Sequence, residues 1–260
     1  LSWKYLAGQC PNFTEMIIFN IIILTLCFLG LLGNGKVIWI LGFHMKRNSF
    51  SIYVLNLAVA DSGILIILVL MQISQILNQN NFNFIFLLLY FVLYNTSQLL
   101  LISISVDRCV SVLFPIWHQC HRPPKLSLIV CAITWVLPIV YFALEMIVIF
   151  SEPFLLFQLV FNALSLKACS LSLHHKQGNL WLTMLLTLLF FLFFGFPMNA
   201  IQYLSLYYPQ CDNPYVYEYA YIGSSLNSTI NPLIYFLVGR DKKESHGKNI
   251  ETSVTTKSDV

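Results

Sequence analysis

Seven runs of mainly apolar residues, each long enough for a helix that crosses a lipid bilayer, constrain the fold more than any other feature of this sequence. The hydrocarbon core of a bilayer is about 30 Å thick, and one helical crossing needs about 20 apolar residues. The runs cover residues 17–41, 53–76, 84–110, 126–150, 154–173, 180–205 and 215–238. Because lipid offers no hydrogen bonds to the backbone, such runs form helices rather than open strands. We therefore predict an all-α membrane protein that folds as a seven-transmembrane helix bundle.

The composition agrees with burial in lipid and argues against several classes of protein. Hydrophobic residues make up 58% of the 260 residues and charged residues only 10%, so a surface exposed to water would aggregate. The seven cysteines form no C-x-x-C pair, which argues against a zinc site or a redox motif. No catalytic set of His, Cys and Asp and no phosphate-binding glycine loop stands out. We expect no enzymatic activity, no organic cofactor and no nucleic-acid partner.

Lysine and arginine residues gather in alternate connections between the runs, and basic residues concentrate on the cytoplasmic side of membrane proteins. The basic side holds Lys46, Arg47, Arg122, Lys125, Lys176, Arg240, Lys242, Lys243 and Lys248. This bias predicts an extracellular segment at 1–16, a seven-helix domain at 17–238 and a cytoplasmic tail at 239–260. The chain starts at Leu1 without a methionine or a signal peptide, so we expect that residues precede it in the natural protein.

The opposite side of the membrane carries acidic residues. Near or within the outer connections lie Glu15, Glu145, Glu152, Asp212 and Glu218. Long-range attraction would draw a basic ligand to this side. The same acids could equally do no more than keep the loop ends solvated, and the pattern leaves both interpretations open.

Asp61 lies midway along the second run, among aliphatic residues. A charge inside lipid is costly, so such a residue is usually functional and needs a partner. Polar residues at matching depths in other runs are Asn34, Ser97, Asn227, Ser228 and Asn231. A sodium ion or a proton is a candidate occupant of this polar core. A plain hydrogen-bonded knot that holds helices together is the alternative.

Two motifs at the predicted cytoplasmic ends of runs could form a conformational switch. Asp107 precedes Arg108 at the end of the third run, where the acid could hold the arginine by a charge-assisted contact until it is released. Side chains that only reach for the membrane interface are the alternative. In Asn231-Pro232-x-x-Tyr235 the proline removes one backbone hydrogen bond, which predicts a hinge.

These motifs occur together in the order and in the spans of rhodopsin-class G-protein-coupled receptors. The matching residues are Gly33-Asn34, Leu57 to Asp61, Asp107 to Cys109, Trp135, Pro138, Pro197 and Asn231 to Tyr235. Within this class, residues 105–123 and 225–239 closely resemble the signatures of the Mas-related family. Gly195 stands where most of the class has a tryptophan, which also resembles that family. The likeness extends from the first span to Gly239.

The resemblance implies a receptor of the plasma membrane that activates a heterotrimeric G protein. Its sixth helix would swing outward about a kink at Pro197, break the contact between Asp107 and Arg108, and let the G protein insert. Phe191, one turn inward of Gly195, matches the residue that relays this motion.

The resemblance also implies where a ligand binds. Glu145 matches the fourth-span acid with which relatives hold cationic ligands, since a carboxylate pairs well with an amine or a guanidinium group. Glu152 could replace a second acid of the relatives, because their longer outer loop is shortened here to Ser151-Glu152-Pro153. We add Tyr94 and Tyr203 to the predicted ligand contacts. The expected ligands are extracellular cationic peptides or amines.

Smaller patterns near the two ends of the chain predict modifications and further partners. Asn12 begins a glycosylation sequon on the outer side. Cys10 and Cys211 are the only thiols predicted outside, so they could form a disulfide or stay free. Phosphorylated serine and threonine residues of the tail would add charge for an arrestin. The last three residues, 258–260, resemble a C-terminal ligand of a PDZ domain.

Two other functions stay open on the sequence alone. The shortened second outer loop also fits a degenerate receptor that folds without responding to a ligand. An ion transporter or channel could use Asp61 and its polar neighbours, although transporters usually show two related halves with interrupted spans and none are apparent here.

Overall fold

The computed structural model describes residues 13–44, 48–77, 83–123, 125–147, 201 and 215–234. Its elements are α1 (Phe13–Trp39), a π-helical turn η2 (Ile40–His44), α2 (Ser49–Ile76), α3 (Asn83–Leu113), the short α4 (Pro115–Cys120) and α5 (Leu126–Ile147). A further helix covers residues 215–234. The part of the chain described here contains no strand.

Four segments of the described chain are long and apolar enough to cross a membrane. They are Thr14–His44, Ser49–Ile76, Phe84–Arg108 and Leu126–Ala143. They coincide with the first four predicted runs, with ends that differ by several residues, and the helix at 215–234 lies in the seventh run. Apart from Ile201, the fifth and sixth runs fall outside the described residues. Side chains such as Phe28, Leu32 and Trp39 are mostly exposed on α1, as a helix face in contact with lipid requires.

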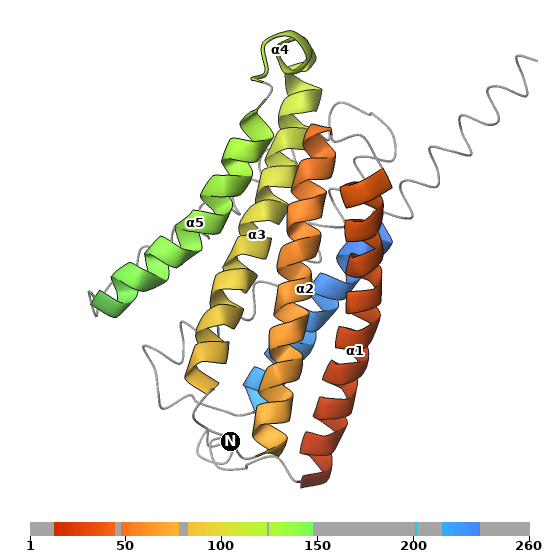
Figure 1. Ribbon diagram of the computed structural model, residues 1–260, viewed down its shortest axis with the longest axis vertical. Helices are drawn as coiled ribbons and strands as arrows, with labels where there is room; N and C mark the ends of the chain where they lie inside the picture. The colour runs from red at the N-terminus through yellow and green to blue at the C-terminus, as the bar shows by residue number, and fades with distance from the viewer. Residues whose placement is uncertain are drawn as a thin grey trace, which may run out of the picture.

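Figure 1 shows how the helices lie relative to one another. α2 packs between α1 and α3, α5 lies beside α3, and α4 follows the end of α3. The helix at 215–234, drawn in blue, crosses behind α1 and α2 and is hydrogen-bonded to α1. We call the end of the bundle that carries α4 the α4 end.

Local sequence determines where the helices near the α4 end begin. Asn48 caps α2, because its Oδ1 accepts hydrogen bonds from the Ser51 backbone N–H at 2.7 Å and from the Ser51 hydroxyl at 2.6 Å. Pro115 begins α4 at a position where a backbone N–H would have no helical partner. The chain therefore turns sharply from α3 through α4 into α5.

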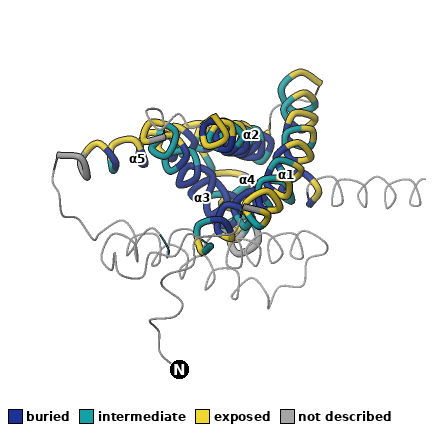
Figure 2. Tube along the Cα trace, turned by 90° about the horizontal axis from the view of Figure 1, so that it is seen from below, coloured by how far each residue is buried: buried dark blue, intermediate teal, exposed yellow. Residues whose placement is uncertain are grey.

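The buried residues gather in the middle of the bundle, as the dark blue stretches of α2 and α3 show in Figure 2, a view along the bundle. One cluster near the α4 end includes Tyr53, Leu57, Leu100, Ile104 and Cys131. A second cluster toward the opposite end includes Ile23, Leu65, Leu68, Tyr90, Tyr94 and Tyr221. The polar core predicted around Asp61 lies between these two apolar layers along α2.

Gly30 permits the close approach of α1 to the helix at 215–234. A Cβ atom at this position would lie 2.5 Å from Thr229 Oγ1 and 2.6 Å from Leu65 Cδ1, and Thr229 Oγ1 already donates to the Leu26 carbonyl at 3.1 Å. We expect Gly30→Ala to lower the stability of the purified protein by about 1–3 kcal/mol through overpacking, which a thermal unfolding curve in detergent would show. Gly35→Ala is the matched control, because a Cβ at Gly35 meets nothing within 4 Å. An equal loss in both variants would contradict this assignment.

Candidate functional site

The Asp61 carboxylate joins three helices in the middle of the bundle. Its Oδ1 accepts a hydrogen bond from Ser97 Oγ of α3 at 2.7 Å, and its Oδ2 accepts one from Asn231 Nδ2 of the helix at 215–234 at 2.8 Å. Asp61 is fully buried, and the two bonds offset part of the cost of removing a carboxylate from water. The structure therefore brings together Asp61, Ser97 and Asn231.

The other predicted polar-core residues differ in whether they contact the Asp61 carboxylate. Asn34 does not bond to Asp61; its Nδ2 donates to the Gly30 and Ser228 carbonyls, each at 3.0 Å, and so ties α1 to the helix at 215–234. The Ser228 side chain faces the Asp61 carboxylate. Asn227, one helical turn before Asn231, is buried and its Oδ1 has no hydrogen-bond partner.

The donor atoms of the polar core suit a sodium ion. Hard cations prefer oxygen ligands, and the core supplies the Asp61 carboxylate and the Ser97 hydroxyl, with the unpartnered Asn227 Oδ1 one helical turn from Asn231. A buried oxygen without a partner is unusual in a native protein and calls for a bound ion or water. A transition metal is not indicated, because the described residues contain no group of three or more His, Cys, Asp or Glu that could hold one.

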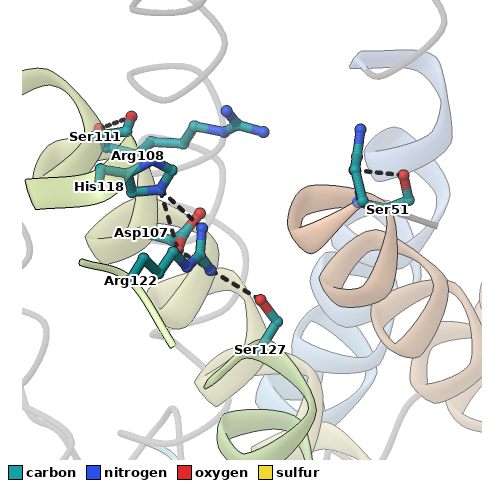
Figure 3. A network of polar contacts seen from close by, with 8 residues as sticks. Ser51, Asp107, Arg108, Ser111, His118, Arg122 and Ser127 are labelled. Carbon is teal, nitrogen blue, oxygen red and sulfur yellow. Dashed lines mark hydrogen bonds and ion pairs between the residues drawn. The ribbon is translucent and has the colours of Figure 1, made fainter. Parts of the chain in front are cut away.

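A second polar network surrounds Asp107 at the α4 end (Figure 3). Asp107 Oδ1 lies 2.6 Å from Arg122 Nη2, and these side chains are only 10% and 8% exposed. Arg122 also donates to Ser127 Oγ at 2.8 Å, and its Nη1 lies 2.7 Å from His118 Nε2. One guanidinium group therefore connects α3, α4 and the start of α5.

Arg108 points away from Asp107 in the same view (Figure 3). Its guanidinium carbon lies 3.9 Å from the centre of the Phe50 ring at the start of α2, a cation–π contact. The contact between Asp107 and Arg108 inferred from the sequence is therefore replaced, in the described part of the chain, by the ion pair between Asp107 and Arg122. Arg122 already supplies a cation to the Asp107 carboxylate, while the Arg108 guanidinium packs on the Phe50 ring.

Sequence reasoning missed the role of Arg122 because it counted this residue only as a marker of the cytoplasmic side. The partners of Arg122 lie on α3, α4 and α5. Arg122 itself is 15 residues beyond Asp107 in the sequence. The tight turn that Pro115 predicts between the third and fourth runs was the one available signal. A similar contact was missed between α2 and α5, where Trp135 Nε1 donates to Asn56 Oδ1 at 3.0 Å.

The remaining predicted site residues are placed only in part. Tyr94 is buried and stacks on Tyr90 with 5.7 Å between ring centres. Pro232 is buried against α1, where a Cβ at Gly33 would lie 3.2 Å from it. Glu145 belongs to α5, but its side chain lies outside the described part. Also outside the described residues are Cys10, Asn12, Glu152, Phe191, Gly195, Pro197, Tyr203, Cys211 and Tyr235.

Comparison with known proteins defines the class of this fold. Residues 33–207, more than half of the chain, match the family described as "7 transmembrane receptor (rhodopsin family)". The Proto-oncogene Mas of Mus musculus is 30% identical, with 90% of this chain and 81% of that protein aligned. The Mas-related G-protein coupled receptor member X2 of Gorilla gorilla gorilla is 34% identical over 88% of this chain and 79% of its own length. Member A1 of Mus musculus is 33% identical, with 85% and 82% aligned.

The chain therefore belongs to the rhodopsin family of seven-transmembrane receptors, and within it to the Mas-related receptors. Membership confirms the predicted seven-helix membrane bundle and the family resemblance read from the motifs. It also identifies the protein as a multi-pass receptor rather than an enzyme.

Proposed function

We propose that the protein is a receptor of the plasma membrane that senses extracellular cationic peptides or amines and activates a heterotrimeric G protein. Its N-terminal segment lies outside and its tail inside the cell, as the distribution of basic residues predicts. The observation that carries the proposal is the Asp61 carboxylate, which links α2, α3 and the helix at 215–234 midway between the outer acids and the Arg108 region.

This linkage gives a physical route from one side of the membrane to the other. Ser97 and Arg108 lie on the same helix, α3, so a shift of α3 that alters the Ser97 bond to Asp61 also moves the inner end of α3. Buried hydrogen bonds in a low dielectric are strong and tend to have discrete arrangements. A bound sodium ion would add positive charge beside Asp61 and favour one of these arrangements. The resemblance extends the switch to Phe191, Gly195, Pro197 and Tyr235.

The α4 end offers an apolar surface beside the inner network. Phe114, Ile116 and Trp117 are exposed there, and Ile116 is 76% exposed. Large exposed apolar side chains next to a charged switch favour a protein partner, and we assign this surface to the G protein. An arrestin that reads a phosphorylated tail and a PDZ domain at the C-terminus remain further proposed partners.

On the outer side we keep the predicted ligand contacts as a proposal. Glu145 and Glu152 would supply negative charge, and Tyr203 an aromatic contact. Tyr94 packs against Tyr90 and is almost inaccessible, so it would form the floor of a site.

The hydrogen bond between Tyr215 and Glu15 supports a covalent tie at the outer end. It places the start of α1 beside the start of the helix at 215–234. Cys10 lies five residues before Glu15, and Cys211 lies four residues before Tyr215. This spacing favours a disulfide between the two cysteines. Asn12 is the proposed glycosylation site of the same segment.

The function is tested by nucleotide exchange on G proteins in membranes from cells that express the full chain, with basic peptides and amines as stimuli. We expect exchange above the level of untransfected cells in the wild type. Arg108→Ala should lower it at least about tenfold, because the residue that the family switch exposes to the G protein is gone. Surface staining of an epitope on the N-terminal segment normalises expression and checks the orientation.

Lys125→Ala is the matched control, since it removes one exposed cation at the same end of the bundle and should leave exchange within about twofold. Normal surface staining without exchange under any stimulus would indicate the degenerate receptor instead. Ion flux in proteoliposomes without a G protein would indicate the transporter or channel.

A further inference from the structure

Among the buried polar side chains that have atoms without a hydrogen-bond partner, three lie around Tyr221 at the end of the bundle opposite α4. They are Glu218, whose Oε2 is unpaired, Ser224, with its Oγ, and Tyr90, with its hydroxyl. Glu218 is 9% exposed, and Ser224 and Tyr90 are fully buried. Buried polar atoms of native proteins are almost always paired, because an unpaired one keeps the full cost of desolvation. An unpartnered oxygen of a carboxylate is the most costly of the three.

These groups belong to one cluster between α3 and the helix at 215–234. The Tyr90 ring packs edge-on against Tyr221, with 5.6 Å between ring centres, and stacks on Tyr94 at 5.7 Å. Ser224 faces the Tyr90 hydroxyl without forming a hydrogen bond to it. Glu218 lies three residues before Tyr221 and close enough to act on it electrostatically, and Ser224 lies three residues after Tyr221, so each is a neighbour of Tyr221 on the helix surface.

The cluster lacks a cation of its own in the described part of the chain. The described lysine, arginine and histidine residues are Lys36, His44, Arg108, His118, His121, Arg122 and Lys125, and all belong to the half of the bundle that carries α4. Glu218, in contrast, is the fourth residue of its helix and lies near the opposite surface. A counter-ion for Glu218 must therefore come from a ligand or from outside the described residues.

We propose that Glu218, Tyr90, Tyr221 and Ser224 form a binding site for an organic cation, a protonated amine or a guanidinium group. The carboxylate neutralises the charge, the hydroxyls of Tyr90 and Ser224 hydrogen-bond to the cation, and the rings of Tyr90 and Tyr221 attract it by cation–π contact. The inference deepens the proposed function and rests on it, because it takes this end as extracellular. It assigns the acid of the ligand site to Glu218 in the seventh helix, in addition to Glu145 in the fourth.

The proposed site also predicts how Glu218→Gln changes the stability of the protein without ligand. Replacing a residue that is kept for packing lowers the stability of the protein, whereas a buried carboxylate oxygen without a partner is itself unfavourable. Glu218→Gln keeps the shape of the side chain and removes the charge. The ligand-free variant should therefore unfold at the same temperature as the wild type or above it.

The test is thermal unfolding of the purified full chain in lipid nanodiscs with 2-phenylethylamine at millimolar concentration. We expect the amine to raise the unfolding temperature by about 3 °C or more through binding to the native state. Its uncharged analogue 2-phenylethanol should cause no rise. Glu218→Gln should abolish the rise, and Tyr90→Phe should reduce it. Glu15→Gln, an acid at the same end of the bundle, should retain it.

A second arm uses a tripeptide of arginine in place of the amine, which distinguishes a peptide side chain from a free amine as the source of the cation. The inference is overturned if neither cation stabilises the wild type, as when the unpaired atoms bind only water. It is also overturned if Glu218→Gln retains the rise or unfolds at a clearly lower temperature without ligand. Stabilisation without any nucleotide exchange leaves the site standing and removes the proposed G-protein function. Nucleotide exchange without stabilisation removes the proposed cation site and leaves the proposed G-protein function standing.

Discussion

Replacing Arg122 by alanine is expected to lower ligand-stimulated nucleotide exchange roughly tenfold, although no change is made to Arg108 itself. Asp107 is nearly buried, and its charge needs a cationic partner. In the wild type that partner is Arg122, which leaves Arg108 to pack on the Phe50 ring. Without Arg122, the next candidate among the described residues is Arg108, the neighbouring residue in the chain. A charge-assisted contact contributes about 1.5–3 kcal/mol, enough to hold Arg108 away from a G protein in most molecules.

A second substitution separates this capture from other effects of Arg122. In the double variant Asp107→Asn with Arg122→Ala no carboxylate is left to capture Arg108, so nucleotide exchange should return to within about threefold of the wild type. Lys125→Ala controls for the loss of one basic residue near the same surface. If the double variant were as weak as Arg122→Ala alone, Arg122 would have to act on the G protein directly. His118, with its Nε2 4.0 Å from Asp107 Oδ1, can replace Arg122 only when its ring is protonated.

Asp61→Ala is expected to have the largest effect on stability. It removes the common acceptor of Ser97 and Asn231, leaving two buried donors unpaired in the middle of the bundle. An unpaired buried donor costs about 1–3 kcal/mol, so the variant should lose roughly 2–4 kcal/mol. Thermal unfolding of the purified protein should show this as a midpoint lower by about 5 °C or more.

Asp61→Asn is the matched variant for this experiment. Its side-chain oxygen can still accept from Ser97, and the Asn231 amide can turn so that its oxygen accepts from the new amide group. We therefore expect a loss of about 1 kcal/mol or less. Repeating both curves in sodium chloride and in choline chloride of equal concentration tests the proposed ion. Sodium should raise the midpoint of the wild type and of neither variant. An equal rise in all three proteins would exclude Asp61 as its ligand.

The sequence predicted the described helices well because hydropathy over about 20 residues is a local property. The approach of Ser97 and Asn231 to Asp61 was also predictable, since each residue has a fixed depth within its span. The partner of Asp107 was not, because Arg122 reaches it through a connection whose path depends on α4 and its packing. Glu218 was read as an outer acid, and its burial could not be foreseen because it depends on how the last helix is rotated about its axis.

The position of α4 also bears on how quickly and how strongly a protein partner can associate with the α4 end. Arg122 and His118 fix the polar side of this short segment to α3 and α5, while Ile116 and Trp117 remain accessible on its surface. A partner that docks there meets a preorganised backbone, so little conformational entropy is lost on association. If salt or a substitution weakened the ion pair between Asp107 and Arg122, α4 would have more conformational entropy in the free receptor. Each association would then have to order α4 again, and binding would be slower and weaker.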